Sequence, residues 1–458
     1  MSQRGHSVNM LQGSLCTNLL RFALPVMLSG LLQLAFNAAD VIVVGRCAGD
    51  TALAAVTSTS ALINLLINAF VGLSMGTNVV VAQALGRWDE DYVQRAVHTC
   101  VLLGTLLGVG IGVVGFFAAP VLLGLMGTPT SVIGEATLYL RIYFLGVPAM
   151  TVYNFGAAVL RGSGDTRRPM LFLIVSGAVN LVLNLLFVLG LGMGVDGVAW
   201  ATTIAQLLSC FFVLRCLMGE EDCRHLNLRR LQLDREVLGQ VVRIGVPASL
   251  QSILLALSNV VIQSSVNSFG DVVMAGAGAS SNIDSFVWTA MNAFYQACLT
   301  FTGGNLGAGD LRRVDKTLWH CMWMAGASGL ILGGAAYVFG RPLLGVYTSS
   351  LQAVEHGMIR SLYVCVPYFL LGMADVVMGS MRGMGCSLSP MISSLLCTCV
   401  LRLAWISTVF RAYHTEPVLY ACYPVSWGVL LLANLMCWLL ARRRVFRKVQ
   451  EQMPTAEP

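Results

Sequence analysis

Residues 161–170 read RGSGDTRRPM, and residues 382–391, 221 positions later, read RGMGCSLSPM. Arg, Gly, Gly, Pro and Met recur at the same places in the two stretches. Each stretch lies between two long apolar runs, and its glycines and proline predict a short basic loop between two helices. Further pairs keep this offset to within two residues: Leu122-Leu123-Gly124 with Leu343-Leu344-Gly345, Leu85-Gly86 with Leu306-Gly307, Cys100 with Cys321, Pro25 with Pro247, and Arg141 with Arg360. The shared offset indicates that the chain is two copies of one unit.

The composition indicates a membrane protein. Of the 458 residues, 56% are hydrophobic and only 11% are charged. Soluble domains average about 25% charged residues, so most of this chain must face lipid or other apolar helices. Most of the fourteen cysteines fall in apolar runs, and none has CxxC spacing, which favours buried thiols over disulfides or metal sites.

Twelve apolar segments approach or exceed the roughly 20 residues needed to cross a bilayer. We place them at 17–45, 52–85, 94–119, 133–160, 169–190, 193–218, 240–267, 273–306, 315–340, 354–381, 388–411 and 418–441. The sequence therefore predicts an all-α integral membrane protein with twelve transmembrane helices in two bundles of six. Six is an even number, so both copies begin on the same side of the membrane and the repeats are parallel.

The predicted helices divide the chain into four parts. We expect a first lobe at 1–218, a cytoplasmic linker at 219–239, a second lobe at 240–441 and a basic cytoplasmic tail at 442–458. In the linker, charged residues alternate with leucines, so we expect it to lie along the inner membrane surface. The first apolar segment has no small-residue cleavage site, which favours a retained helix over a signal peptide.

The distribution of lysine and arginine predicts the orientation of the chain in the membrane. With the N-terminus inside, 22 of the 28 lysines and arginines fall in inside segments and 3 in outside loops. This bias predicts cytoplasmic termini and insertion in the cell (inner) membrane. The formal net charge of +6 suits anionic lipid headgroups and needs no nucleic-acid partner. His98 and His320 fall near equivalent cytoplasmic helix ends, where we expect solvated or headgroup-facing rings.

Polar side chains inside the predicted spans are the candidate functional residues, because such groups are expensive in lipid. They are Gln33, Asn37 and Asp40 on one face of the first span, Asn180 and Asn184 one turn apart on the fifth, and Thr202 on the sixth. Asp40 has a structural alternative, since it lies roughly 30 Å along its helix and an interfacial aspartate would look the same. Asn180 and Asn184 also have a structural alternative, because they could simply form hydrogen bonds between helices. The polar stripe on the first span favours a functional role for Asp40.

Several motifs together resemble the multidrug and toxic compound extrusion (MATE) family. They are the RGxGDxRxPM loop, the twelve helices in two halves, the first helix LPVMLSGLLQLAFNAADVIVVGR and the QALGRWDED turn after the second. The resemblance covers residues 19–442 and is greater to the DinF-type branch. It implies a secondary antiporter whose two lobes form a V-shaped central cavity open alternately to the two sides. Such a protein exports organic cations, drugs or other amphipathic compounds in exchange for H⁺ or Na⁺. We expect a monomer in the lipid bilayer, with small-molecule substrates and no cofactor besides the coupling ion.

The resemblance also implies a cation site in the first lobe. The branch's aspartate on helix one matches Asp40, its asparagine on helix five matches Asn180, and its threonine on helix six matches Thr202; Na⁺ is a possible occupant. An acid commonly follows one turn after the asparagine, and this chain has Asn184 there. The acid site of the other branch, on helix seven, is absent, because residues 248–270 contain no carboxylate. With one carboxylate left in the site, we expect H⁺ rather than Na⁺ to be the coupling ion.

The second lobe has charged candidates of its own. Asp284, Asp375 and Arg402 lie inside predicted spans. Asp375 and Arg402 have the charges to form an intramembrane pair, with either a structural role or a role in gating and coupling.

Two other function classes stay open. One is a flippase of lipid-linked precursors, because the superfamily contains flippases with similar duplicated lobes. Against it, the chain stops at twelve helices and its spans offer only Arg141, Arg360 and Arg402 to hold a pyrophosphate. The other is an integral-membrane enzyme. The sequence contains no HExxH, no P-loop and no nucleophile elbow in a plausible context, so we expect no catalytic residues.

Overall fold

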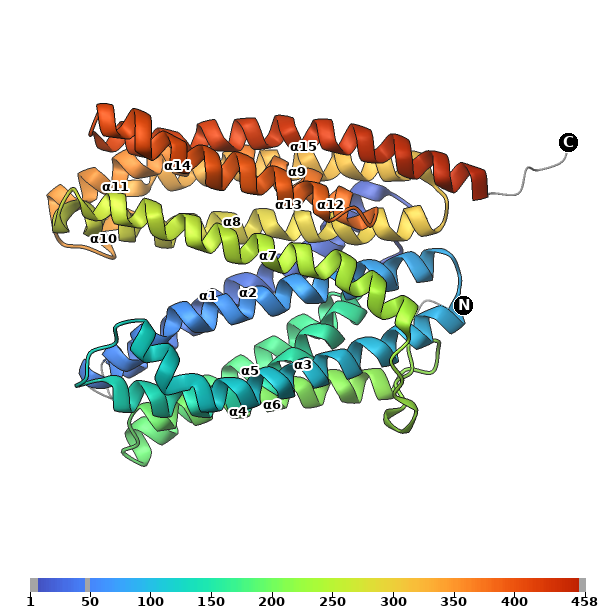
Figure 1. Ribbon diagram of the computed structural model, residues 1–458, viewed down its shortest axis with the longest axis horizontal. Helices are drawn as coiled ribbons and strands as arrows, with labels where there is room; N and C mark the ends of the chain where they lie inside the picture. The colour runs from blue at the N-terminus through green and yellow to red at the C-terminus, as the bar shows by residue number, and fades with distance from the viewer. Residues whose placement is uncertain (1–6, 46–49, 453–458) are drawn as a thin grey trace, which may run out of the picture. The chain divides into compact units, whose positions relative to one another are not determined.

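The computed structural model describes residues 7–45 and 50–452, and these residues form helices and short connections. The first repeat comprises α1 (Leu15–Val43), α2 (Asp50–Gly86), α3 (Glu90–Leu125), α4 (Ile133–Gly162), α5 (Arg167–Leu185) and α6 (Val195–Met218). The second comprises α7 (Arg235–Asn267), α8 (Asp271–Gly307), α9 (Leu311–Val338), α10 (Gly340–Gly345), α11 (Leu351–Val364), α12 (Tyr368–Gly383), α13 (Leu388–Ser394), α14 (Leu401–Trp405) and α15 (Glu416–Gln452). Figure 1 shows the long helices of each repeat running side by side. The predicted all-α architecture is confirmed.

Each predicted span corresponds to a helix or to a broken helix. Within the described residues, ten helices are long and apolar enough to cross a membrane, and α11 and α12 make an eleventh span bent by 42°. The bend falls at Pro367, whose ring cannot continue a helix without losing a backbone hydrogen bond. The twelfth predicted span is α8, which is 37 residues long but carries more polar residues. Because many of its side chains are buried against neighbouring helices, α8 needs less apolar surface than a lipid-facing helix.

Contacts within the chain divide it into two compact units. The first unit comprises Leu28–Val242, and the second comprises Val8–Met27 with the chain from Arg243 onward. Residues of the predicted linker therefore group with the first unit, and the first half of α1 groups with the second. Residues 1–6 and 453–458, at the ends of the predicted first lobe and basic tail, lie outside the described residues.

The duplicated loops end their helices in the same way. Gly164 and Gly385 have φ angles of +84° and +81°, a left-handed conformation that glycine adopts without strain. In each loop, the amide of the glycine and the amide of the residue after it donate to carbonyls of the last helical turn at 2.8–2.9 Å. This arrangement is a Schellman motif. The sequence repeat is thus also a repeat of backbone geometry.

The turn that leads into α3 repeats in the turn that leads into α9, with one difference. Trp88 and Gly309, 221 residues apart, both have positive φ, of +61° and +74°. The aspartate after each caps the next helix, accepting from a backbone amide at 2.9 Å. A tryptophan in the left-handed region carries strain of about 1–2 kcal/mol that glycine avoids.

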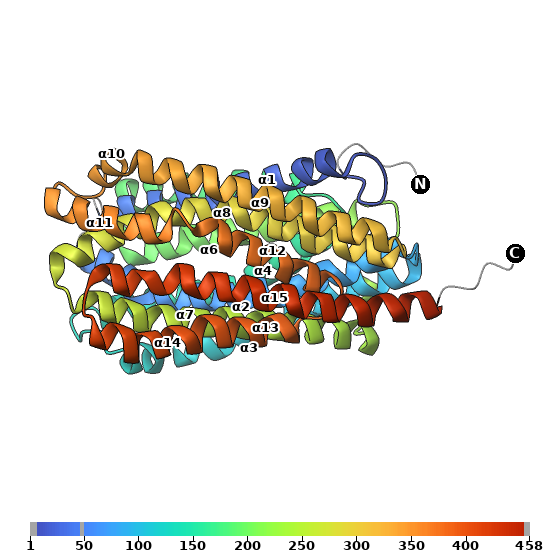
Figure 2. The ribbon, with the colours of Figure 1, turned by 90° about the horizontal axis from the view of Figure 1, so that it is seen from above.

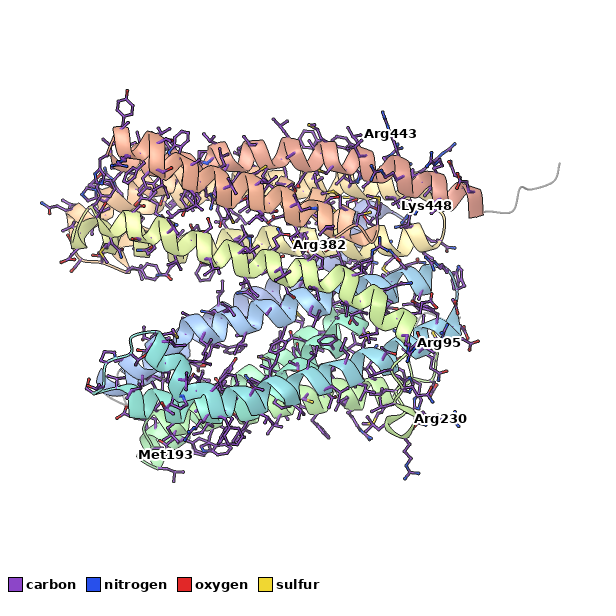
Figure 3. All side chains as sticks on the ribbon, viewed as in Figure 1. Arg95, Met193, Arg230, Arg382, Arg443 and Lys448 are labelled. Carbon is purple, nitrogen blue, oxygen red and sulfur yellow. The ribbon has the colours of Figure 1, made fainter. Side chains whose placement is uncertain are left out.

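The linker packs on the first unit through polar contacts with α3. Thr99 donates to the Gln232 carbonyl at 3.1 Å, and Arg95 pairs with Asp234 at 2.8 Å (Figure 3 labels Arg95). His98 is only 6% exposed: its Nδ1 donates to a carbonyl of its own helix, so its Nε2 accepts the Asn227 amide at 3.1 Å. The prediction of a solvated or headgroup-facing ring is therefore wrong for His98, whereas His320 is exposed.

An ionic cluster ties the start of the linker to the first duplicated loop. Arg168 pairs with Asp165 and with Glu220, and Glu220 also accepts from Arg224 at 3.0 Å. Burial acts to raise the pKa of Asp222, but the hydrogen bonds that Arg224 donates outweigh it and lower that pKa. The linker leucines divide, with Leu226 buried but Leu228 and Leu233 exposed, so only part of the linker presents the apolar surface that a membrane-lying segment requires.

The repeated turn yields a test of stability. Gly309→Ala should lower the apparent unfolding midpoint in detergent, by the equivalent of about 1 kcal/mol, because alanine strains the left-handed conformation. Trp88→Gly should leave the midpoint unchanged or raise it, since it removes strain from an exposed position. Thermal unfolding followed by size-exclusion fluorescence measures both, and a midpoint lowered more by Trp88→Gly than by Gly309→Ala would contradict this assignment.

Candidate functional site

Three helices of the first unit position the predicted cation-site residues. Asp40 lies near the end of α1, Asn180 and Asn184 lie one turn apart on α5, and Thr202 lies on α6. The duplicated loop fixes where α5 begins, and Pro169 in its first turn lacks the amide hydrogen that the start of a helix leaves unpaired. Asn180 is 6% exposed and Asn184 is fully buried, so both amides must find partners inside the protein.

The two asparagines bind the carboxylate of Asp40. Asn184 Nδ2 donates to Asp40 Oδ1 at 2.6 Å. The Asn180 amide satisfies both of its atoms when its Nδ2 donates to Asp40 Oδ1 and Oδ2, at 2.9 and 3.1 Å, and its Oδ1 accepts the Thr202 backbone amide at 3.3 Å. Four residues that are far apart in the sequence thus form one cluster, which we call the Asp40 cluster.

One atom of the Asp40 cluster has no partner. The Asn184 Oδ1 is buried and accepts no hydrogen bond from any part of the chain that the structure describes. An unpaired buried acceptor beside a carboxylate is a position at which a proton donor or a cation is stabilised.

Two predicted residues do not join the cluster. Gln33 and Asn37, earlier on α1, are exposed, and within the described residues no hydrogen bond connects them to Asp40. Their spacing puts them on one helix face with Asp40. In the Asp40 cluster, however, the hydrogen bonds from α5 reach α1 at Asp40, near the end of α1, and not at these two earlier residues.

Two more polar residues lie on neighbouring helices, and sequence reasoning missed one of them, Tyr139. Tyr139 on α4 is 7% exposed and lies close enough to Asp40 to interact with its charge. Gln206 on α6 lies against α4, where a Cβ atom on Gly146 would come within 2.2 Å of its Oε1. A tyrosine in an apolar run gives little signal of its own; the available signal was that Tyr139 and Tyr143 lie one turn apart and so share a helix face.

In the second unit, a different ion pair forms from the one that the sequence suggested. Arg360 Nη2 donates to Asp284 Oδ2 at 2.9 Å, and its Nη1 donates to Ser280 Oγ at 2.8 Å. Arg360 and Asp284 are 8% and 6% exposed. A buried pair with a further hydrogen bond has the geometry that offsets the desolvation of two charges.

The predicted pair between Asp375 and Arg402 is wrong. Arg402 Nε donates to Ser426 Oγ at 3.0 Å, and its guanidinium lies 4.4 Å from the centre of the Tyr423 ring. Both partners belong to α15, so the side chain points toward that helix and not toward Asp375 on α12. A cation held over an aromatic ring can stay charged without a carboxylate.

Gln251 lies on α7, the helix on which residues 248–270 contain no carboxylate. It is buried, donates to Ser394 Oγ at 2.8 Å and accepts from Arg382 Nη2 at 2.6 Å. Arg382, labelled in Figure 3, begins the second duplicated loop and is only 4% exposed. A neutral amide therefore occupies this part of the second unit.

The observed ion pair makes a stability prediction. Asp284→Ala leaves the Arg360 guanidinium buried and unpaired, which should cost about 3–5 kcal/mol and lower the yield of folded protein. The double variant Asp284→Ala with Arg360→Met should recover most of that loss. Asp375→Ala is the matched control and should cost less, because no cation pairs with Asp375 in the described structure. Folded yield and the apparent unfolding midpoint in detergent measure all three; a double variant no better than Asp284→Ala would contradict the pairing.

Comparisons with known proteins agree with the duplicated architecture. Residues 25–186 and 247–406 match the model of the MatE family, one range in each repeat. "Probable multidrug resistance protein YoeA" of Bacillus subtilis (strain 168) is 30% identical over 420 residues, which are 90% of each chain. "Probable multidrug resistance protein YpnP" of the same strain is 29% identical over 391 residues, 85% of this chain and 87% of that one.

A solved structure shares the fold. It is a multidrug resistance MATE family transporter of the MOP superfamily in its outward-facing conformation, with a TM-score of 0.89 at 22% identity. The alignment covers 98% of this chain and 100% of that one. Matches in both repeats, a relative of 30% identity over nearly the whole length and a shared fold confirm the resemblance that the motifs indicated. The chain therefore belongs to the MatE family and is a multi-pass membrane transporter of the multidrug efflux type.

Proposed function

We propose that the protein is an H⁺-coupled antiporter and that Asp40 is the residue that takes up the proton. Its exported substrates are organic cations, drugs or other amphipathic compounds. We also propose that it acts as a monomer in the inner membrane with cytoplasmic termini; the positive-inside bias of the sequence supports this orientation of the termini. The observation that carries the proposal is that the hydrogen bonds to the Asp40 carboxylate come from two neutral amides.

A carboxylate held by neutral groups keeps its full negative charge. In the second unit, the charge of Asp284 is neutralised by Arg360, but among the described residues no lysine or arginine pairs with Asp40. An unneutralised charge inside a membrane protein is expensive, and a proton removes that charge. Asp40 is therefore suited to exchange a proton, and Asp284 is suited to a fixed structural role.

The orientation of the Asn184 amide supports H⁺ over Na⁺. A bound Na⁺ requires several oxygen ligands directed at it, whereas Asn184 directs its N–H group at the carboxylate. Only the Asn184 Oδ1 is left as an unpaired acceptor. For Na⁺ to bind through the Asn184 oxygen, this amide would have to turn and give up its hydrogen bond to Asp40.

Protonation of Asp40 also supplies a way to move helices. When the carboxylate is ionised, it accepts hydrogen bonds from α5 and so joins that helix to the end of α1. When it is protonated, its hydroxyl becomes a donor, and an amide N–H that faces it must turn away. Proton uptake from one side of the membrane therefore weakens the hydrogen bonds that join α1 to α5. Proton release on the other side restores the link and resets the carrier.

The flippase alternative finds little support among the cations. Arg360 is paired with Asp284, and Arg402 is held by Ser426 and Tyr423. Arg141, the third arginine within the spans, donates to the Phe116 carbonyl at 3.3 Å. A site for a pyrophosphate would need several cations that converge on one cavity.

The coupling ion is tested by changing one atom of Asp40. Asp40→Asn should abolish efflux driven by a pH gradient in sodium-free liposomes, because the side chain no longer exchanges a proton. Folding should survive, since the asparagine oxygen still accepts from Asn184. Asn37→Ala, one turn earlier on an exposed part of α1, is the control and should retain most of the transport. Full pH-driven efflux by Asp40→Asn, or efflux by the unaltered protein that runs on a sodium gradient alone, would overturn the proposal.

A second variant tests why the ion is H⁺. Asn184→Asp restores the second acid that is common in the DinF-type branch, adding one negative charge and replacing an N–H donor with an oxygen. We expect efflux by this variant to gain a dependence on the sodium gradient, with at least a severalfold higher rate at high external sodium. Asn184→Ser removes the amide without adding charge and should gain no sodium dependence. Equal sodium dependence in both variants would contradict the role assigned to the number of carboxylates.

A further inference from the structure

A bidentate ion pair joins α9 to α15 at one end of the second unit. Arg442 donates from Nε and Nη2 to the two carboxylate oxygens of Asp315, at 2.8 and 2.6 Å. The guanidinium also lies 4.7 Å from the centre of the Phe446 ring, which fixes it further. Beyond this pair, the end of α15 runs on past the turn that joins α8 to α9 (Figures 1 and 2).

The ion pair fixes which residues lie beside it. The helix α9 begins at this end of the unit and α15 finishes here, so the two helices are antiparallel. Consecutive residues turn by about 100° around a helix, and in an antiparallel pair this rotation carries both next residues to the same side. Lys316 and Arg443 therefore share one side of the Asp315–Arg442 pair. The preceding residues, Val314 and Ala441, turn to the other side and are 0% and 8% exposed, as expected for the side that faces the core.

Both cations are exposed, and apolar side chains continue from them along the helices. On α9, Trp319 and Trp323 return to the side of Lys316 and are 51% and 77% exposed. On α15, Met436 and Leu439 return to the side of Arg443, which Figure 3 labels, and are 66% and 50% exposed. The face thus has positive charge at its end, indole rings next to the charge and aliphatic surface beyond. We call it the α9–α15 face.

The first unit covers the equivalent surface with its own chain. By the offset of 221 residues, Lys316 corresponds to Arg95 and Trp319 to His98. Arg95 pairs with Asp234 of the linker, and His98 accepts the Asn227 amide. In the second unit, α15 brings Arg443 to this face, and neither Lys316 nor Arg443 has a carboxylate partner in the described chain. Two exposed cations on one side of the pair favour an anion from outside the protein.

We propose that the α9–α15 face binds an anionic phospholipid, with its phosphate at Lys316 and Arg443 and its acyl chains along Trp319, Trp323, Met436 and Leu439. The order of groups along the face matches the order in the lipid, from charged headgroup through the polar interface to hydrocarbon. Tryptophan is suited to the middle position, where its N–H meets the interface and its ring meets hydrocarbon. Cations near a membrane surface attract anionic lipid, and two on one side of the pair select a headgroup of net negative charge over a zwitterion.

Quenching of tryptophan by brominated lipids tests the site in the full-length protein. Vesicles of phosphatidylcholine carry a small, equal mole fraction of dibrominated phosphatidylglycerol or dibrominated phosphatidylcholine. We expect the association constant for the anionic lipid, obtained from the quenched fluorescence, to exceed that for the zwitterionic lipid by about tenfold. Trp319→Phe with Trp323→Phe should remove the strongly quenched component, which assigns it to this face.

The double variant Lys316→Gln with Arg443→Gln should reduce the preference to less than twofold. Arg229→Gln with Arg230→Gln is the matched control, because it removes two exposed charges from the linker and none from this face (Figure 3 labels Arg230). The control should keep the full preference. Lys316→Gln alone should give an intermediate value, and elution of each variant as a single species checks that it is folded. Equal quenching by the two lipids, or equal loss of preference in the double variant and in the control, would overturn the proposal.

Discussion

A carboxylate inside a membrane protein has to be neutralised or stabilised by hydrogen bonds, and the carboxylate of Asp40 accepts hydrogen bonds from two amides. This arrangement requires three helices of the first unit to meet at one level, with Asp40 from α1, two asparagines from α5 and Thr202 from α6. It satisfies most of the hydrogen-bonding capacity of the carboxylate but none of its charge. Because this negative charge is not neutralised by a cation, Asp40 is suited to bind a proton.

The two repeats hold an acid within a span in opposite ways. In the first unit the acid is Asp40 and its partners are neutral, whereas in the second unit Asp284 is fixed by the guanidinium of Arg360. The second unit also has the neutral Gln251 on α7, bonded to Arg382. Duplicated units with the same helix ends and the same turns have thus diverged in charge. We infer that Asp40 exchanges the proton in the first unit and that the charge of Asp284 in the second unit stays fixed.

Much of the fold followed from the sequence because its causes are local or repeated. Apolar runs of about 20 residues predicted the spans, and the offset of 221 residues predicted the duplication that backbone geometry confirms at Gly164 and Gly385. The one-turn spacing of Asn180 and Asn184 predicted that both would share a face, and both do reach Asp40. Contacts that depend on how far one helix is rotated against another did not follow. Arg402 faces α15 and not Asp375, and His98 is covered by a linker whose path the sequence does not specify.

Uptake of the coupling proton by Asp40 is observed most directly by infrared difference spectroscopy on the reconstituted protein. Acidification in sodium-free buffer should produce the carbonyl stretch of a protonated carboxylic acid, together with a shift in the amide bands of asparagine side chains as Asn184 loses its acceptor. Both signals should be absent from Asp40→Asn. The same carboxylic-acid band in Asp40→Asn would assign the proton to another residue. Amide shifts produced by sodium at constant pH, with no carboxylic-acid band on acidification, would show that the Asp40 cluster binds a metal cation instead.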